Sequence, residues 1–182
     1  GYLLYVKEHF SQSLREWREI SYYEDILKIP NVRLYHPSSN IKKLIENSSL
    51  VVSIGGTVSF EAAFYQKPSI IMSDMGFSIL PSIQKINSLE EFPSKIRNGL
   101  KMKVNSDDLD KYLSVLEEHS FELDLKEYEI NEANFFRHGG NFHDTEITDE
   151  KMQLFLENSK IFFEILTNNY VEKIKKFKEK KI

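Results

Sequence analysis

Short apolar runs alternate with amphipathic segments through the first hundred residues of the chain. The apolar runs fit strands at residues 2–7, 32–35, 50–54 and 69–72. Between them, apolar residues at helical spacing predict helices at 14–27, 41–48 and 57–66. Strands that alternate with helices through short loops are typical of a parallel sheet with right-handed crossovers. The pattern therefore predicts an α/β, Rossmann-like fold in which helices flank a parallel sheet.

The run at 50–54 is apolar throughout apart from Ser53, which is typical of a strand that is covered on both faces. Asn40, after a turn-rich segment, is a candidate N-cap for the helix that follows, and Ser39 is the alternative. These two features indicate one strand and the start of one helix in the expected fold.

The second half of the chain is more helical in its pattern. Apolar stripes predict helices at 89–100 and 107–118, and Asp149 is a candidate N-cap for a long amphipathic helix. The segment 121–148 lacks periodicity, so we expect a long loop there. The sequence thus predicts a Rossmann-like domain at 1–148 and a C-terminal helix with a lysine-rich tail at 149–182.

Composition narrows the function classes. The chain of 182 residues has no cysteine, which excludes a disulfide scaffold, a cysteine-ligated zinc and a thiol nucleophile. The net charge of −4 argues against general binding of nucleic acids. The absence of cysteine also fits a cytoplasmic protein, and no apolar run approaches the ~20 residues that span a bilayer. A strand-like run at the very start suggests a fragment of a longer protein.

Charge is unevenly distributed along the chain. Residues 171–182 contain six lysines and two glutamates, a local charge of +4, which leaves about −8 for the rest. A basic end on an amphipathic helix fits a peripheral contact with anionic lipid at the inner face of the cell membrane. Lysines also favour the C-terminus of any helix, so both interpretations stay open.

The strongest chemical signal lies where the apolar run at 50–54 ends. Gly55, Gly56 and Thr57 form a tight turn that opens the next expected helix, and such a turn presents free amides and the positive helix dipole to an anion. Glu61 lies one turn further along the same face, where a carboxylate suits a ribose diol. The alternative is an ordinary strand-to-helix turn with an exposed glutamate. The motif is neither a Walker loop nor the dinucleotide fingerprint.

Histidines follow the first two expected strands. In an open parallel sheet, ligands bind outside the carboxyl ends of the strands. His9 would then lie at the same sheet edge as the glycine turn and could reach a phosphate. A surface histidine is the alternative, and a rigid turn is the simpler reading of His36-Pro37.

A metal site receives little support from the spacing of candidate ligands. His138, His143 and Asp144 lie in a segment without a helical period that could align them. The acidic run at 107–110 opens an expected helix, where the dipole favours negative charge. We therefore expect no metal.

Several segments resemble a known family when they are taken together. They read YVKEH, PNVRLYHPSSNIKKLIENSSLVVSIGGTVSFEAAFYQKPSII and FSILPSIQKI. They resemble the C-terminal, donor-binding half of GT-B glycosyltransferases, above all capsular or surface polysaccharide biosynthesis proteins, which typically read K-E-H-P and then G-T-x-G-x-E-A before G-K-P. The resemblance covers about residues 2–86. It implies a domain that binds a UDP- or CMP-sugar as its substrate, without a metal or another cofactor.

The resemblance also implies roles for individual residues. His9 and the turn at Gly55, Gly56 and Thr57 would face the donor phosphates, and Glu61 would face the ribose. The loop at 36–37 (His36 and Pro37) would lie near the base. The amides of Gly56 and Thr57, together with His9 as the catalytic candidate, would stabilise charge on the departing phosphate. A glycan or lipid-linked acceptor would bind a missing N-terminal domain, so we expect the fragment alone to be inactive.

The chain departs from the family pattern at three positions. Phe10 stands in place of a proline, Ser59 in place of a glycine, and Gln66 in place of the glycine before Lys67-Pro68. Two alternatives remain at this point. One is a fragment of an enzyme like UDP-N-acetylglucosamine 2-epimerase, and the other is a non-catalytic assembly module.

Overall fold

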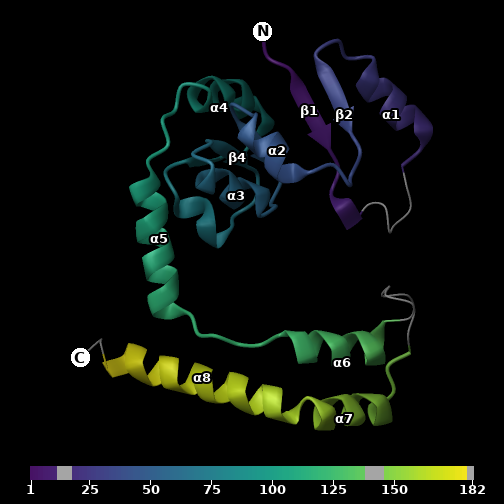
Figure 1. Cartoon of the computed structure of the whole chain (residues 1–182), viewed down its shortest axis with the longest axis vertical. Coiled ribbons are helices and arrows are strands. Elements are labelled where there is room, and N and C mark those ends of the chain that lie inside the picture. The colour runs from purple at the N-terminus through teal and green to yellow at the C-terminus, as the bar shows by residue number, and fades with distance from the viewer. Residues whose placement is uncertain (12–17, 138–145, 180–182) are drawn as a thin grey trace. The chain divides into compact units, whose positions relative to one another are not determined.

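A computed structural model describes residues 1–11, 18–137 and 146–179 of the chain (Figure 1). The chain forms two compact units, Gly1–Asp110 and Lys111–Ile182, and each unit is described by itself. The predicted metal candidates His138, His143 and Asp144 lie outside the described residues. The same holds for the first part of the helix predicted at 14–27.

The first unit is built from parallel strands and helices, as the sequence predicts. Its strands are β1 (Leu4–Lys7), β2 (Val32–Tyr35), β3 (Val51–Ser53), β4 (Ser69–Ile71) and β5 (Ile83–Lys85). Its helices are α1 (Ile20–Leu27), α2 (Ile41–Glu46), α3 (Val58–Phe64) and α4 (Phe92–Gly99), with 3₁₀ turns η2 (Gly76–Ile79) and η3 (Leu89–Glu91). Helix α5 (Ser106–His119) crosses the boundary between the units. The α/β, Rossmann-like fold class is confirmed.

The parallel strands of this unit form two sheets. β1 pairs with β2, and β4 pairs with β3 on one side and β5 on the other. Strand β4 is therefore central, and its side chains are fully buried. Strand β3 is an edge strand, where Val52 is 38% exposed and Ile54, just after it, is 71% exposed. The expectation that the run at 50–54 is covered on both faces is wrong, because β4 takes the central place in this sheet.

Helix α3 covers the sheet with its smallest side chains. Ser59, Ala62 and Ala63 recur at the spacing of one helix face, and all three are buried. The Ser69 hydroxyl on β4 donates to the Ser59 carbonyl oxygen at 3.1 Å, which ties the helix to the central strand. Ser59 therefore faces the protein interior. A small residue is needed there because the helix packs closely against the sheet.

The C-terminus of α3 ends in a Schellman motif. The Lys67 amide donates to the Ala62 carbonyl at 2.9 Å, and the Gln66 amide donates to the Ala63 carbonyl at 3.0 Å. Gln66 itself has φ 53°, in the left-handed region that favours glycine. A residue with a Cβ is strained at this position, so glycine would be the unstrained residue here and Gln66 is not.

Gln66→Gly is therefore expected to stabilise the first unit. A side chain in the left-handed region destabilises the folded state by roughly 1–2 kcal/mol, and glycine removes this strain. Part of the resulting gain in stability is lost, because glycine has greater conformational freedom in the unfolded chain. We expect a net gain of about 0.5–1 kcal/mol, measured as a higher midpoint in urea unfolding. Tyr65→Gly, one residue earlier at the C-cap with φ −97°, is the matched control and should not stabilise. An equal gain in both variants would contradict the explanation.

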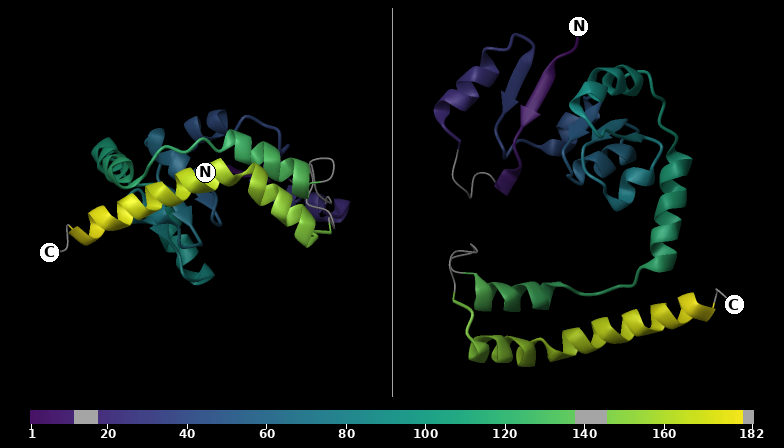
Figure 2. Two further views of the ribbon diagram at one scale, coloured as in Figure 1. Left: turned by 90° about the horizontal axis from the view of Figure 1, so that it is seen from below. Right: turned by 180° about the vertical axis from the view of Figure 1, so that it is seen from behind.

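The second unit is helical. It contains α6 (Lys126–Phe136), α7 (Asp149–Asn158) and α8 (Lys160–Glu179), and α6 runs beside α7 (Figure 2). Its core is aromatic: the Tyr128 ring stacks on Phe162 at 4.5 Å, and Phe136 meets Phe155 edge-on at 4.7 Å. The prediction of a long loop at 121–148 is wrong for the residues that form α6. This helix is stabilised by aromatic contacts with residues far along the chain and not by a periodic apolar stripe of its own.

The long C-terminal helix is confirmed, but it is interrupted once. The break falls at Ser159, which is buried and follows the end of α7. The N-cap of α7 is Thr148, whose hydroxyl oxygen accepts from the Lys151 amide at 3.3 Å, so Asp149 is the first helical residue and not the cap. Earlier in the chain, the predicted cap Asn40 is confirmed by the same type of bond from the Lys43 amide. The two compact units divide after Asp110, before the predicted boundary at 148, because α6 packs with α7.

Candidate functional site at the carboxyl ends of the strands

The predicted site residues follow the carboxyl ends of three strands. His9 lies two residues after β1, and His36 directly follows β2, so both lie at the carboxyl edge of one parallel sheet. Gly55 follows β3, at the carboxyl edge of the other sheet. Strand pairing within the described residues does not join the two sheets. The expectation that His9 and the glycine turn share one sheet edge therefore stays a prediction.

Both histidines are oriented by a serine two residues further on. The Nδ1 atom of His9 lies 2.8 Å from the Ser11 hydroxyl and accepts from the Ser11 amide at 3.3 Å. His36 has the same arrangement with Ser38, at 2.7 and 3.2 Å. Because a backbone amide can only donate, Nδ1 acts as an acceptor and the neutral ring carries its proton on Nε2. The Nε2–H group of His9 is thus in the right form to donate to an anion.

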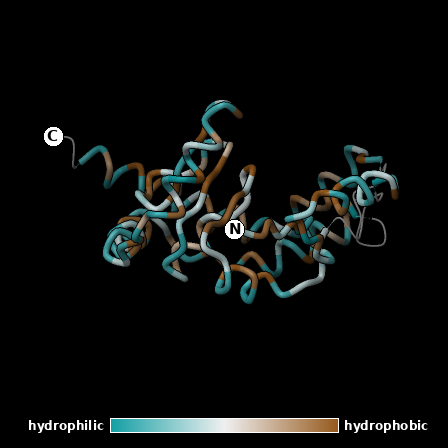
Figure 3. The backbone as a smooth tube through the Cα atoms, turned by 90° about the horizontal axis from the view of Figure 1, so that it is seen from above, coloured by the Kyte–Doolittle hydropathy of each residue, from teal (hydrophilic) through white to brown (hydrophobic). Residues whose placement is uncertain are grey.

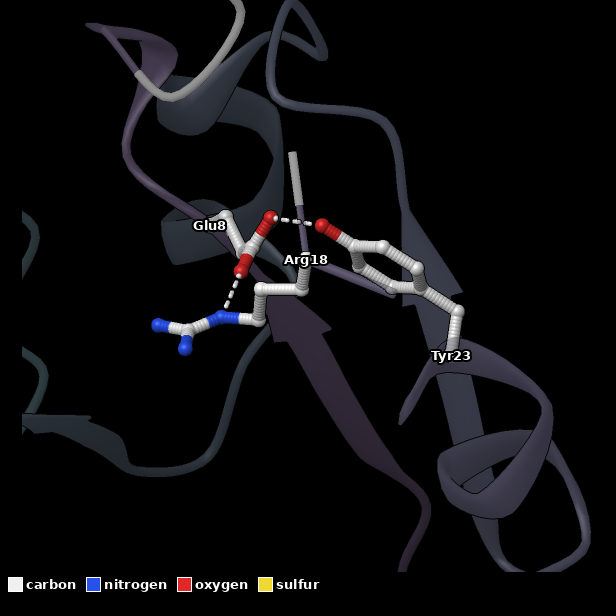
Figure 4. Close-up of polar contacts among 3 residues, drawn as sticks. All are labelled: Glu8, Arg18 and Tyr23. Atoms are coloured by element: carbon white, nitrogen blue, oxygen red, sulfur yellow. Dashed lines mark hydrogen bonds and ion pairs between the residues drawn. The ribbon is translucent and has the colours of Figure 1, made fainter. Parts of the chain in front are cut away.

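Glu8, between the end of β1 and His9, forms a polar network that the sequence did not reveal (Figure 4). One carboxylate oxygen accepts from Arg18 Nε at 2.8 Å, and the other accepts from the Tyr23 hydroxyl at 2.8 Å. The Arg18 guanidinium also lies over the Tyr22 ring at 4.9 Å. These partners are 10 and 15 residues from Glu8 in the sequence, so no local motif reports them. The network ties Glu8, the residue before His9, to Arg18 and to Tyr23 on α1.

Tyr23 is the group whose titration this network changes. Its removal from water, and then its hydrogen bond to the Glu8 carboxylate, raise the pKa of Tyr23 above its ordinary 10.0. A raised pKa in the folded state means that neutral Tyr23 stabilises the fold fully below pH 10.0 and that this contribution is lost as the pH rises through the raised pKa. Glu8→Gln is expected to lower the pKa of Tyr23 toward the ordinary value, as measured by tyrosine-ring NMR in alkaline titration.

Glu24→Gln is the control for this titration. It removes one carboxylate from α1 next to Tyr23, but this carboxylate is not part of the network. A Tyr23 pKa that is the same in Glu8→Gln and in the unmodified chain would show that Glu8 does not perturb the tyrosine.

The glycine turn is shaped by two serines. A Cβ on Gly55 would lie 3.1 Å from the Ser73 hydroxyl oxygen, and a Cβ on Gly56 would lie 3.0 Å from that of Ser53. The Gly56 amide donates to the Ser53 hydroxyl oxygen at 2.8 Å. In this arrangement the Gly56 amide is used by Ser53, and its contact with a phosphate stays a prediction. The glycines are needed for close packing of the turn itself.

The backbone amides at the start of α3 are available to bind a ligand. Within the described residues, the Thr57 and Val58 amides donate to no protein acceptor. The Thr57 hydroxyl donates to Glu61 Oε1 at 3.0 Å, so the structure brings these two predicted residues together across one helical turn. The Glu61 Oε2 atom accepts no hydrogen bond from the described part of the chain. The site therefore offers two donors and a carboxylate oxygen at the start of one helix.

The rest of the described chain was a possible location for a metal site or a second binding pocket. Among residues 1–11, 18–137 and 146–179, no three histidine, aspartate or glutamate side chains are grouped as metal ligands. Asp107 and Asp108 lie in the first turn of α5, where the helix dipole accounts for them. A shallow hollow of about 320 Å³ lies on the second unit, and its lining residues are Leu156, Lys160, Phe163, Glu164, Thr167 and Asn168. It contains none of the predicted site residues.

The chain matches no protein-family model, no curated protein and no solved structure in the three comparisons. The resemblance to GT-B glycosyltransferases therefore stays a prediction that rests on the residues quoted for it.

Proposed function

We propose that the first unit binds a sugar nucleotide, as the donor-binding half of a glycosyltransferase for capsular or cell-surface polysaccharide. The observation that carries this proposal is the arrangement at the start of α3. There, the Thr57 and Val58 amides are unused by the protein, and the Glu61 carboxylate lies one turn further along. In a parallel α/β fold, ligands bind at the carboxyl ends of the strands, where this turn lies.

Each group in the proposed site has a distinct chemical task. The two amides and the helix dipole would bind the diphosphate or monophosphate of a UDP- or CMP-sugar. Glu61 Oε2 would accept from a ribose hydroxyl, and Thr57 would hold the carboxylate in place through the bond to Oε1. The loop at His36-Pro37 would lie beside the base.

Transfer would proceed by stabilising the leaving group. As the bond from the sugar to the phosphate breaks, negative charge grows on the phosphate oxygen. The Thr57 and Val58 amides and the Nε2–H group of His9 would donate to that charge. The acceptor and the catalytic base would belong to a further domain, so this chain would bind the donor and turn nothing over by itself.

Titration of the chain with UDP, CMP and GDP tests the proposal. We expect weak binding of UDP or CMP, with NMR shifts at Thr57, Val58 and Glu61. Glu61→Gln should weaken binding roughly 10–100-fold, because a hydrogen bond to a charged group is worth about 1.5–3 kcal/mol. Glu46→Gln, at the exposed end of α2, makes the same chemical change away from the turn and should leave affinity unchanged. No binding of any nucleotide would overturn the proposal and favour a non-catalytic assembly module.

A further inference from the structure

The last three turns of α8 present an exposed apolar face. Tyr170, Ile174 and Phe177 recur at intervals of four and three residues, which places them on one side of the helix. They are 56%, 52% and 55% exposed. Figure 3 shows the same alternation, as apolar brown and polar teal segments along the helix that leads to the C-terminus. A row of half-exposed apolar side chains of this length is typical of a surface that binds something other than water.

The start of this face is held against the rest of the second unit. The Tyr170 ring meets the Phe121 ring edge-on at 5.3 Å, and the Lys173 ammonium group donates to the Glu118 carbonyl oxygen at 2.6 Å. These contacts fix the helix while leaving Ile174 and Phe177 half-exposed further along it. The face is thus presented by an ordered helix.

Lysines flank the apolar face. The described residues 171–179 contain Lys173, Lys175, Lys176 and Lys178 against Glu172 and Glu179, a local charge of +2 (four minus two) in a chain whose net charge is −4. At 100° per residue, Lys173 and Lys178 lie about 70° to either side of the centre of this face, and Lys175 lies further round the helix beyond Lys178. Long lysine side chains in such places can keep their ammonium groups in a polar layer while the neighbouring apolar residues are buried.

We propose that the end of α8 lies on the surface of an anionic lipid membrane, with Tyr170, Ile174 and Phe177 at the boundary of the acyl chains and the lysines among the headgroups. Charge complementarity favours this partner. Two copies of the helix would bring like charges together, whereas anionic headgroups supply the missing negative charge. None of the helices in the described ranges combines the length and apolar composition needed to cross a bilayer, which fits a helix lying along the surface. The inference does not depend on the proposed sugar-nucleotide site.

Sedimentation of the chain with lipid vesicles tests this proposal. We expect binding to vesicles made of equal parts phosphatidylglycerol and phosphatidylcholine, and no binding to phosphatidylcholine alone. Each lysine near an anionic surface strengthens binding by about fivefold, so Lys175→Gln with Lys178→Gln should weaken it roughly 25-fold. Ile174→Gln should weaken it about tenfold by removing apolar contact with the acyl region.

Matched variants separate this helix from general charge attraction. Lys101→Gln with Lys103→Gln removes the same charge from two exposed residues of the first unit, and Ile79→Gln removes an exposed isoleucine from η2. Both should bind as the unmodified chain does. Equal weakening in the lysine control, or no sedimentation with anionic vesicles, would overturn the proposal. So would a dimer in analytical ultracentrifugation that Ile174→Gln dissociates, because the face would then belong to a second copy.

Discussion

Phe155→Ala is expected to destabilise the helical unit by about 3–5 kcal/mol, the range for removing a buried aromatic side chain. Phe155 is buried on α7, with its ring 5.9 Å from Tyr128, 4.7 Å from Phe136 and 6.3 Å from Phe163. The substitution leaves a cavity where rings from three helices meet, and the backbone cannot close it without moving a helix. Amide hydrogen exchange should report the loss directly, with protection in α7 and α8 falling roughly 10²–10³-fold.

Leu154→Ala is the control for this effect. Leu154 precedes Phe155 in the same helix but lies on the exposed side, so its removal should cost less than about 1 kcal/mol. If both variants lost protection equally, α7 would not be held by its aromatic face.

Ile70→Ala should destabilise the first unit by about 2–5 kcal/mol. Ile70 is fully buried at the middle of β4, between Val52 on β3 and Gln84 on β5. The loss should appear in urea unfolding and as faster amide exchange in all three strands. It should also loosen the glycine turn, because the Ile54 carbonyl accepts from the Met72 and Ser73 amides at 3.0 and 2.8 Å where β4 ends.

Ile79→Ala provides the comparison on the same unit. Ile79 in η2 is 78% exposed, so its truncation should change stability by no more than about 0.5 kcal/mol. A large loss in this variant, or a negligible one in Ile70→Ala, would contradict the assignment of β4 as the centre of the core.

Local periodicity predicted most elements of the first unit because their residues contact the sheet through regular spacing. The strand at 32–35 matches β2 residue for residue, and the expected helix at 107–118 lies within α5. The division into two sheets could not be predicted, since strand pairing depends on partners far along the chain. The same reason applies to α6, whose Tyr128 stacks on a ring 34 residues away (162 minus 128).

The candidate site was predicted in part. Sequence alone pointed to the glycine turn and Glu61, because their residue types are unusual after an apolar run. It missed the roles of Ser53 and Ser73, whose hydroxyls fill the space beside Gly55 and Gly56, and it missed the Glu8 carboxylate with its two donors. A serine in a strand or a glutamate after one carries no signal of its partner until the chain is folded.

The edge position of β3 bears on how the molecule behaves at high concentration. The side chains of Val52 and of Ile54, just after the strand, are exposed, and the β3 edge opposite β4 pairs with no strand of the described residues. An edge of this kind is a template for pairing with a strand from another molecule, and natural proteins commonly protect such edges with charge. Ile54→Lys would place such a charge beside this edge, just before the glycine turn.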